Sequence, residues 1–422
     1  MPGVVQYCRS RSELRSGRRT PKVLREGTHR SQNVESTLRH VLRVAPIMGI
    51  TRVANVTGLD SVGIPVVMVC RPNSRSLAVS QGKGIDLANA RASGLMEAAE
   101  LYHAETITLP LRLATYEELR YQHNVIEVNE FPRQSSSLFE PNLRLLWCEG
   151  FDLLRGENVF VPYEMVHTNY TTPFSDGHGC FPASSNGLAS GNQLVEAISQ
   201  AICEVIERDA TTLWKLRGEE KLNHGRLDLE SVDDPICREI LGKFERAGVY
   251  VAAWDITTDV GISAFACFIV PRGDNTTWHC TVATGYGCHP AREVALARAL
   301  TEAAQGRLTV ISGVRDDFWR DDYYRWLDLD LVRAMRRRLT RSKPTRRFSD
   351  IPHRDGETLE DDVEWELKRI KKVGIRRVVV VDLTKPEFGL PVVRVIVPGF
   401  ESILCLGYTP GRRGRLILSK QA

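Results

Sequence analysis

Three Ala-rich stretches of the sequence carry polar residues at the same spacing. Offsets of four and seven separate the members of each set: Ser93, Glu97 and Glu100; Gln200, Glu204 and Glu207; Arg298, Glu302 and Gln305. Residues at these offsets return to one side of an α-helix, so each set predicts a polar stripe on a helix. Clustered carboxylates repel one another unless a cation lies between them, and divalent metal ions on a polyphosphate would supply that cation.

Carboxylates dominate the candidate site, and they are the ligands that Mg²⁺ prefers. The candidate metal ligands are Glu97, Glu100, Glu196, Glu204, Glu207 and Glu302. Arg208 and Arg298 could contact phosphate oxygens, and Ser93 and Asn192 are short groups suited to phosphate, ribose or metal-bound water. Lys83 lies in a Gly-rich segment before a predicted helix, where backbone N–H groups favour anions. The alternative is that the stripes are the solvated faces of three surface helices.

The common nucleotide-binding motifs do not describe this site. Gln81-Gly-Lys-Gly84 lacks the frame of a Walker-type P-loop. The kinase set is also incomplete, because D-F-G is missing and the tripeptide His353-Arg-Asp355 lacks the Asn that follows it in a kinase catalytic loop. A nucleotide would therefore be bound through acidic helices.

Composition places the chain among soluble proteins, with 42% hydrophobic and 26% charged residues. A net charge of +4 is too small to indicate nucleic-acid binding. Basic runs at 9–30 and 333–347 predict either solvated segments or docking sites for an acidic partner or peptide. No stretch is long and apolar enough to span a membrane, and the N-terminus lacks a secretory apolar region. We expect a cytoplasmic protein with reduced thiols.

The elements that position the candidate residues can be read from the pattern. We expect a flexible basic arm over residues 1–40 and a folded domain over 41–422, with a catalytic core at about 45–315 and a C-terminal α/β layer at about 316–422. Asp86 is expected to cap the first striped helix, and Pro290 to begin the third. A strand and a Gly-rich loop precede each helix, twice clearly and once loosely, as in a very diverged repeat.

The wording of these motifs resembles the YcaO family. Gly82-Lys-Gly84 with Ser93-Gly-Leu-Met-Glu-Ala-Ala-Glu100 is similar to its first ATP-binding motif, and Ser185-Asn-Gly-Leu-Ala-Ser-Gly-Asn192 continuing to Arg208 to its second. Arg298-Ala-Leu-Thr-Glu-Ala-Ala-Gln-Gly-Arg307 resembles the third. The resemblance runs from about residue 45 to the end. It implies an α+β fold of the YcaO type, with mixed β-sheets and three acidic helices that converge on one Mg-ATP site.

The resemblance also implies a reaction and its residues. YcaO proteins use ATP and Mg²⁺ to activate a peptide backbone amide, which then accepts a nucleophile. The six glutamates correspond to the Mg²⁺ positions, and Ser93, Asn192, Arg208 and Arg298 to ATP contacts, with Lys83 and Gln305 beside them. Glu207, Arg208, Arg298 and Glu302 are the expected catalytic residues.

Two features favour a thioamide product. The chain ends Arg415-Leu-Ile-Leu-Ser-Lys-Gln-Ala422 and so lacks the Pro-rich tail of azoline-forming members. The stretch from Val378 to Val395 resembles members that act with a TfuA protein. The implied partners are a TfuA-like protein, a precursor peptide or protein, a sulfide donor and a second copy in a homodimer. An azoline-forming cyclodehydratase and a nucleotide-binding scaffold without chemistry are the alternatives.

Overall fold

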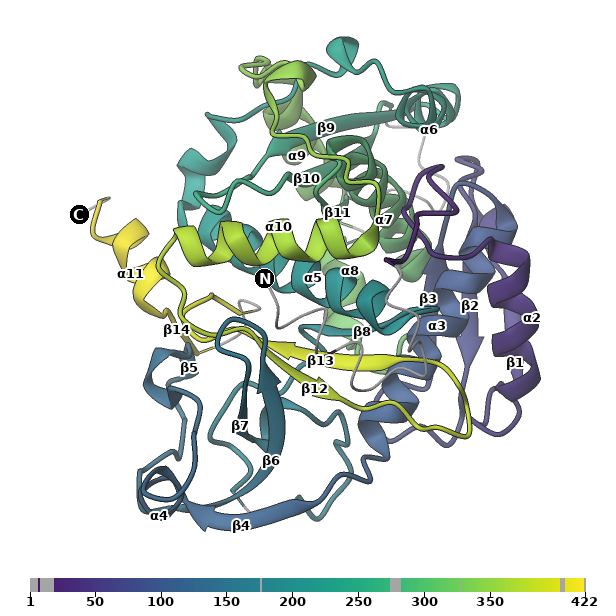
Figure 1. Ribbon diagram of the computed structural model, residues 1–422. Helices are drawn as coiled ribbons and strands as arrows, with labels where there is room; N and C mark the ends of the chain where they lie inside the picture. The colour runs from purple at the N-terminus through teal and green to yellow at the C-terminus, as the bar shows by residue number, and fades with distance from the viewer. Residues whose placement is uncertain are drawn as a thin grey trace. The chain divides into compact units, whose positions relative to one another are not determined.

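The computed structural model describes Tyr7 and residues 19–174, 177–273, 282–326, 328–402 and 407–420 (Figure 1). Its chain forms two compact units. Unit 1 comprises residues 1–22, 99–218 and 356–422, and unit 2 comprises residues 23–98 and 219–355. Each unit is therefore built from separate segments of the chain.

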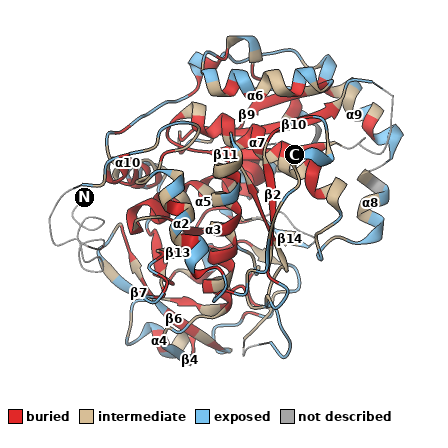
Figure 2. Ribbon diagram, turned by 90° about the vertical axis from the view of Figure 1, so that its right-hand side faces the viewer, coloured by how far each residue is buried: buried red, intermediate tan, exposed pale blue. Residues whose placement is uncertain are grey.

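Unit 2 contains two three-stranded antiparallel sheets, in the orders β1-β2-β3 and β11-β10-β9. Its strands are β1 (Arg52–Asn55), β2 (Val66–Cys70), β3 (Val79–Lys83), β9 (Val249–Asp255), β10 (Ala264–Pro271) and β11 (Ala283–Cys288). Its helices are α2 (Val34–Val44), α6 (Pro235–Arg246), α7 (Arg292–Ser312), α8 (Arg320–Trp326) and α9 (Leu329–Arg341). Helix α7 packs on β10 and β11, and the buried colour of Figure 2 marks much of this region. Helix α3 (Leu87–Glu105) begins in unit 2 and ends in unit 1.

Unit 1 is built on a six-stranded antiparallel sheet with the path β4-β6-β12-β13-β8, in which β7 pairs with β6. Its strands are β4 (Leu111–Thr115), β5 (Arg133–Gln134), β6 (Arg144–Asp152), β7 (Glu157–Pro162), β8 (Leu188–Ser190), β12 (Val379–Asp382), β13 (Val392–Ile396) and β14 (Tyr408–Thr409). Its helices are α4 (Tyr116–Arg120), α5 (Leu194–Leu216), α10 (Leu359–Lys372) and α11 (Arg412–Leu418). Helix α5 packs against β8 and β13 and against α10. The expected α+β fold class is confirmed.

The C-terminal strands β12 and β13 pair with strands from earlier in the chain. Strand β12 pairs with β6, and β13 pairs with β8, so both lie inside the sheet of unit 1. All five residues of β13 are buried. A continuously buried strand needs neighbours along both edges and cover on both faces, and the earlier strands of the chain provide the neighbours.

Part of the expected flexible arm is packed on helix α10. Arg19 forms ion pairs with Asp361 and Glu364, and the Thr20 backbone N–H donates to Glu360 Oε2 at 2.8 Å. The Lys22 ammonium lies 2.7 Å from Asp362 Oδ2, and both side chains are fully buried. The acidic first turn of α10 therefore binds these basic residues within unit 1. Residues 8–18 of the arm lie outside the described residues.

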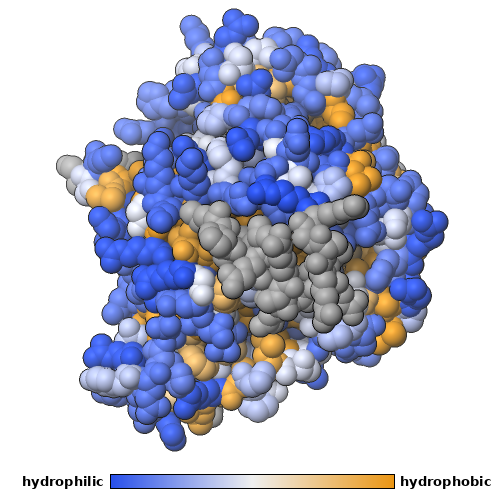
Figure 3. All heavy atoms as spheres, viewed as in Figure 1, coloured by the Kyte–Doolittle hydropathy of each residue, from blue (hydrophilic) through white to orange (hydrophobic). Residues whose placement is uncertain are grey.

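On the face shown in Figure 3, hydrophilic residues predominate and hydrophobic ones form small separate groups. Among the described residues, no helix is both long enough and apolar enough to cross a lipid bilayer.

Candidate functional site

The three striped helices α3, α5 and α7 begin at matching positions. They start at Leu87, Leu194 and Arg292, so the members of each stripe lie six, ten and thirteen residues after the first helical residue. Asp86 caps α3 as expected, because its Oδ1 accepts from the Asn89 backbone N–H at 2.7 Å. Pro290 does not begin α7, because the helix starts two residues later.

The glycines expected to form loops lie within or beside strands instead. A Cβ on Gly82 in β3 would lie 2.0 Å from the Ala90 carbonyl oxygen, and one on Gly287 in β11 would lie 2.1 Å from that of Ala295. Each contact reaches a residue eight positions later, so the same geometry occurs in two places. Glycine is required because the helix backbone lies directly on the strand before it.

This close contact lets the strands hold the acidic side chains. The Gln81 N–H in β3 donates to Glu97 Oε1 at 3.3 Å, and the Tyr286 N–H in β11 donates to Glu302 Oε1 at 3.1 Å. In unit 1, Ser190 in β8 donates to Glu100 Oε1 from its backbone N–H at 2.8 Å and its hydroxyl at 2.7 Å. Strand donors therefore hold one carboxylate oxygen of each of these three glutamates.

Unit 2 brings together part of the predicted set. Lys83 Nζ lies 2.8 Å from Glu302 Oε2, and about a quarter of each side chain is exposed. Gln305 Nε2 donates to the Gln81 side chain at 3.1 Å, which ties α7 to β3. Arg298 Nη1 donates to the Cys288 carbonyl at 3.2 Å.

The first stripe places Ser93 one turn before Glu97 on α3, and both are partly buried. In unit 2, this stripe therefore presents the Ser93 hydroxyl and the Glu97 carboxylate on the same side of the helix.

Unit 1 holds the remaining predicted residues, mostly on α5. Asn192 Nδ2 donates to Glu196 Oε1 at 3.2 Å. Glu196 is 3% exposed and Glu207 is 8% exposed, although both carry carboxylates. Glu204 and Arg208 are partly buried. Because these carboxylates are buried, α5 is not a surface helix with a solvated acidic face. Buried carboxylates also require compensating partners.

Arg394 in β13 is a candidate site residue that is absent from the predicted set. It is 3% exposed, and its Nη2 donates to the Ser184 carbonyl at 2.6 Å. Among the described residues, its Nε and Nη1 atoms have no hydrogen-bond partner. Burial lowers the pKa of its guanidinium to about 10, against the opposing influence of Tyr170 and Glu204. The signal was present in the sequence, because an arginine interrupts the apolar run of β13.

The chain's C-terminal segment packs on α5 directly after the predicted site residues. Arg413 Nη2 lies 3.1 Å from Asp209 Oδ2, and Asp209 Oδ1 accepts from the Glu401 backbone N–H at 2.9 Å. Burial raises the pKa of Asp209 to about 6. Glu401 in turn accepts from the backbone N–H groups of Gly411 and Gly414. The tail is therefore held on α5 beside Glu207 and Arg208 without a Pro-rich motif.

The described cysteines with shifted pKa values are poor nucleophiles. Burial raises the pKa of the Cys148 thiol to about 12 and that of Cys180 to about 11. It also raises the thiol pKa values of Cys237 and Cys267. Burial therefore favours the protonated thiol, which is a weaker nucleophile than the thiolate.

Comparison with known proteins identifies relatives for this arrangement. A family model described as "YcaO cyclodehydratase", with ATP and Mg²⁺ binding, matches residues 81–401. An uncharacterized protein in the tfuA 3' region of Rhizobium leguminosarum bv. trifolii is 39% identical over 366 residues, covering 84% of each chain. An uncharacterized protein of Methanothermobacter thermautotrophicus is 34% identical over 381 residues, covering 88% of this chain and 94% of the relative.

Solved structures share the fold. YcaO from Methanopyrus kandleri, bound with AMPPCP and Mg²⁺, matches with a TM-score of 0.72 and 24% identity, covering 90% of this chain and 95% of that one. A heterocyclase in complex with substrate and cofactor matches with a TM-score of 0.78 and 24% identity. This match covers 98% of the present chain and 57% of the heterocyclase, so the chain spans little more than half of that protein.

Proposed function

The chain belongs to the YcaO family, and from this premise we propose that it uses ATP and Mg²⁺ to activate a peptide backbone amide and to install a thioamide with a TfuA-like partner. ATP and Mg²⁺ are the cofactors that the matching family model describes. One observation carries the proposal: three helices with matching starts carry the predicted carboxylates, and strand donors hold those of Glu97, Glu100 and Glu302 on α3 and α7. The relative named for its position beside tfuA supports the choice of partner.

The residues of each unit fit a magnesium nucleotide. Glu100, Glu196, Glu204 and Glu207 in unit 1 offer oxygen ligands, as Glu97 and Glu302 do in unit 2. The buried Arg394 side chain, with Nε and Nη1 unpaired among the described residues, fits an anionic phosphate oxygen. Bound Mg²⁺ would supply positive charge to offset the triphosphate.

The chain's own side chains have separate tasks in this proposal. Asn192 orients Glu196, and the strand N–H groups orient Glu97, Glu100 and Glu302. Arg208 and Arg298 donate hydrogen bonds to phosphate oxygens, and Lys83 and Gln305 hold the α7 side of the site. Ser93 contributes a hydroxyl to the nucleotide. The residues that act nearest the transferred phosphoryl group are Glu207, Arg208, Arg298 and Glu302.

The proposed reaction balances without a protein nucleophile. The amide oxygen takes the γ-phosphoryl group of ATP, and sulfide then adds to the amide carbon. Loss of phosphate carries away the former amide oxygen, so the products are a thioamide, ADP and phosphate. Phosphorylation converts a poor oxide leaving group into a good one, and positioned cations stabilise the charge on the transferred group.

Two alternatives predict different products. Azoline formation on a Cys, Ser or Thr would make the peptide lose one water, whereas thioamidation exchanges oxygen for sulfur. A nucleotide-binding scaffold would bind ATP and give no product with any partner. Mass spectrometry of a co-expressed precursor peptide, with sulfide and a TfuA-like protein supplied, separates the three. Light scattering tests the homodimer that we propose with this function.

Glutamate substitutions test the site in both units. We expect E207Q and E302Q each to weaken binding of a non-hydrolysable Mg-ATP analogue at least about tenfold, because each removes a carboxylate from the cation's ligands. E239Q, on the exposed face of α6, is the matched control. Isothermal titration calorimetry measures the change. Wild-type affinity in both site variants would exclude these glutamates from nucleotide binding.

A further inference from the structure

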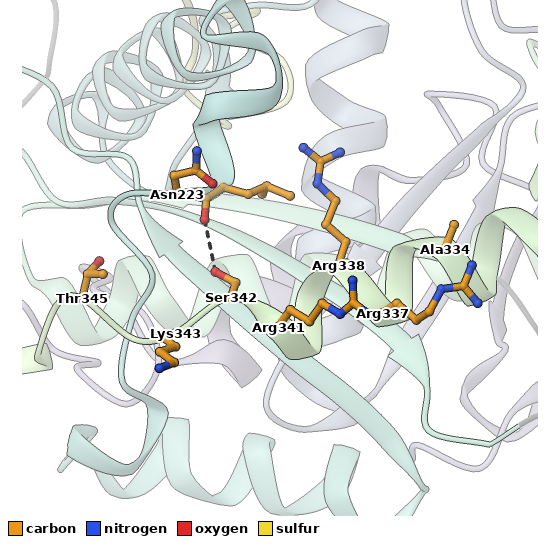
Figure 4. A pocket seen from close by; sticks show the side chains of 9 residues that line it. Asn223, Ala334, Arg337, Arg338, Arg341, Ser342, Lys343 and Thr345 are labelled. Carbon is orange, nitrogen blue, oxygen red and sulfur yellow. Dashed lines mark hydrogen bonds between the residues drawn. The ribbon is translucent and has the colours of Figure 1, made fainter.

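A basic pocket of about 550 Å³ lies in unit 2, at the C-terminal half of α9. It is lined by Leu222, Asn223, Ala334, Arg337, Arg338, Arg341, Ser342, Lys343 and Thr345. Four of these nine residues are cationic, and none is acidic. Figure 4 shows the three arginines arising from one helix, with Lys343 on the segment that follows it. The proposed nucleotide chemistry uses none of these residues.

The pocket has a fixed wall. The buried Arg226 donates from Nη1 to the Leu339 carbonyl at 3.0 Å, near the end of α9. Ser342 Oγ donates to the Leu222 carbonyl at 3.1 Å (Figure 4), and the Thr345 N–H donates to the Arg226 carbonyl at 2.8 Å. The segment that closes the pocket is therefore anchored on both sides of Lys343.

The cations of the pocket are not explained by capping of the helix. Basic residues in a last turn usually compensate its carbonyl groups. Here Arg226, from outside α9, already donates to one of those carbonyls. Arg337, Arg341 and Lys343 are exposed, and they form no ion pair within the part of the chain that the structure describes. Their charges are available to an anionic ligand.

The spacing of the arginines indicates the form of that ligand. Arg337 and Arg341 are four residues apart on one helix side, a rise of about 6 Å. Alternate side chains of an extended peptide lie about 6.6 Å apart on one side. Carboxylates at alternate positions of an extended segment therefore match the spacing of these two arginines along the helix.

We infer that the basic pocket binds an extended acidic segment of the polypeptide substrate, with Asp or Glu at alternate positions. The choice of substrate as the source rests on the proposed function. Binding itself rests on the lining charges and their spacing. Helix α8 contacts α9, and the exposed side chains of Trp319, just before α8, and of Tyr324 on α8 offer apolar contacts for flanking residues.

A synthetic peptide tests the inference. The probe is a short fluorescein-labelled peptide with Glu at alternate positions, compared with one of identical composition whose glutamates are contiguous. Fluorescence anisotropy with the full chain should show tighter binding of the alternating peptide, weakening as salt screens the charges. R337E/R341E should lower its affinity at least about tenfold, because each change replaces attraction by repulsion. R39E/R43E, an exposed pair with the same spacing on α2, should stay within about twofold.

Several outcomes would overturn the inference: no binding by the wild-type chain, equal losses in both double variants, or displacement by an equal concentration of inorganic phosphate. If R337E/R341E does not fold by circular dichroism, K343E gives the same comparison with a single exposed residue. Calorimetry with the ATP analogue separates the two proposals. If the chain binds the peptide but not the ATP analogue, the proposed function is contradicted and the peptide-binding inference is supported. If it binds the ATP analogue but not the peptide, the peptide-binding inference is contradicted and the proposed function is supported.

Discussion

A buried guanidinium with unpaired nitrogen atoms destabilises a fold unless a ligand completes its hydrogen bonds. Arg394 is in this position, since its Nε and Nη1 have no partner among the described residues and Glu204 is its nearby acidic group. In the ligand-free chain, the buried Arg394 guanidinium should destabilise the fold, because burying a charge with incomplete partners costs free energy. The same atoms would donate charge-assisted hydrogen bonds to phosphate oxygens.

We therefore expect R394M to lower ATP turnover at least about tenfold, which corresponds to the loss of one hydrogen bond to a charged group. Its melting temperature should stay the same or rise, because a buried charge with incomplete partners is removed. R112M, at an exposed position in β4 of the same sheet, is the control. Unchanged turnover in R394M would show that Arg394 does not contact the nucleotide.

At the scale of elements, one glycine-dependent contact recurs. Strands β3 and β11 place a glycine under the following helix, and the next residue toward the N-terminus in each strand donates to a glutamate sixteen positions later. The same offsets in two places indicate that α3 and α7 are positioned by a common device. Packing on the strand therefore fixes the acidic stripe, and the sequence of the helix alone does not.

Gly287→Ala tests this device. Its Cβ would lie 2.1 Å from the Ala295 carbonyl oxygen, so α7 must move away from β11. We expect the free energy of unfolding to fall by about 1–3 kcal/mol or more, and nucleotide affinity to fall with it as Glu302 shifts. Gly58→Ala, where a Cβ meets nothing within 4 Å, should change stability by less than about 0.5 kcal/mol. Urea unfolding of both variants provides the measurement. Wild-type stability of G287A would contradict the close contact.

Periodicity predicted some elements well and missed others for physical reasons. The three expected striped helices are present as α3, α5 and α7. The glycines of β3 and β11 suggested loops, since a single sequence does not reveal that a helix lies against them. The role of Arg394 depends on pairing between β13 and β8, which are about two hundred residues apart. The stripes were visible because helical spacing is local.

At the scale of the whole molecule, the described residues 19–22 belong to unit 1. The Lys22–Asp362 pair joins chain segments 340 residues apart, and both side chains are buried. Arg25 and Asp355 in unit 2 form an ion pair at 2.5 Å whose side chains are 42% and 35% exposed. The two ion pairs join similar groups, but the first is buried and the second is exposed. They should therefore contribute differently to the free energy of unfolding.

Lys22→Ala removes the cation of the buried pair with Asp362, so we expect the free energy of unfolding to fall by about 3–5 kcal/mol. Arg25→Ala, at the exposed pair, should cost less than about 1 kcal/mol. The double variant K22M/D362N should recover part of the loss by removing both charges. Chemical denaturation of the three variants gives the comparison. If K22A and R25A lower the free energy of unfolding equally, burial does not determine how much an ion pair contributes to stability.

The contact between the C-terminal segment and α5 should make unit 1 sensitive to pH. Burial raises the pKa of Asp209 from its unfolded value near 3.9 to about 6, even with Arg413 beside it. Between these values the folded chain keeps a proton that the unfolded chain has lost. The contribution of Asp209 to stability is therefore fully present below about pH 4, and it falls by about 3 kcal/mol as the pH rises through 6. D209N cannot titrate, so the wild-type free energy of unfolding minus that of D209N should decrease across this range. Urea unfolding at several pH values measures the difference, and a flat or rising difference would mean that Asp209 is ionised in the folded chain throughout.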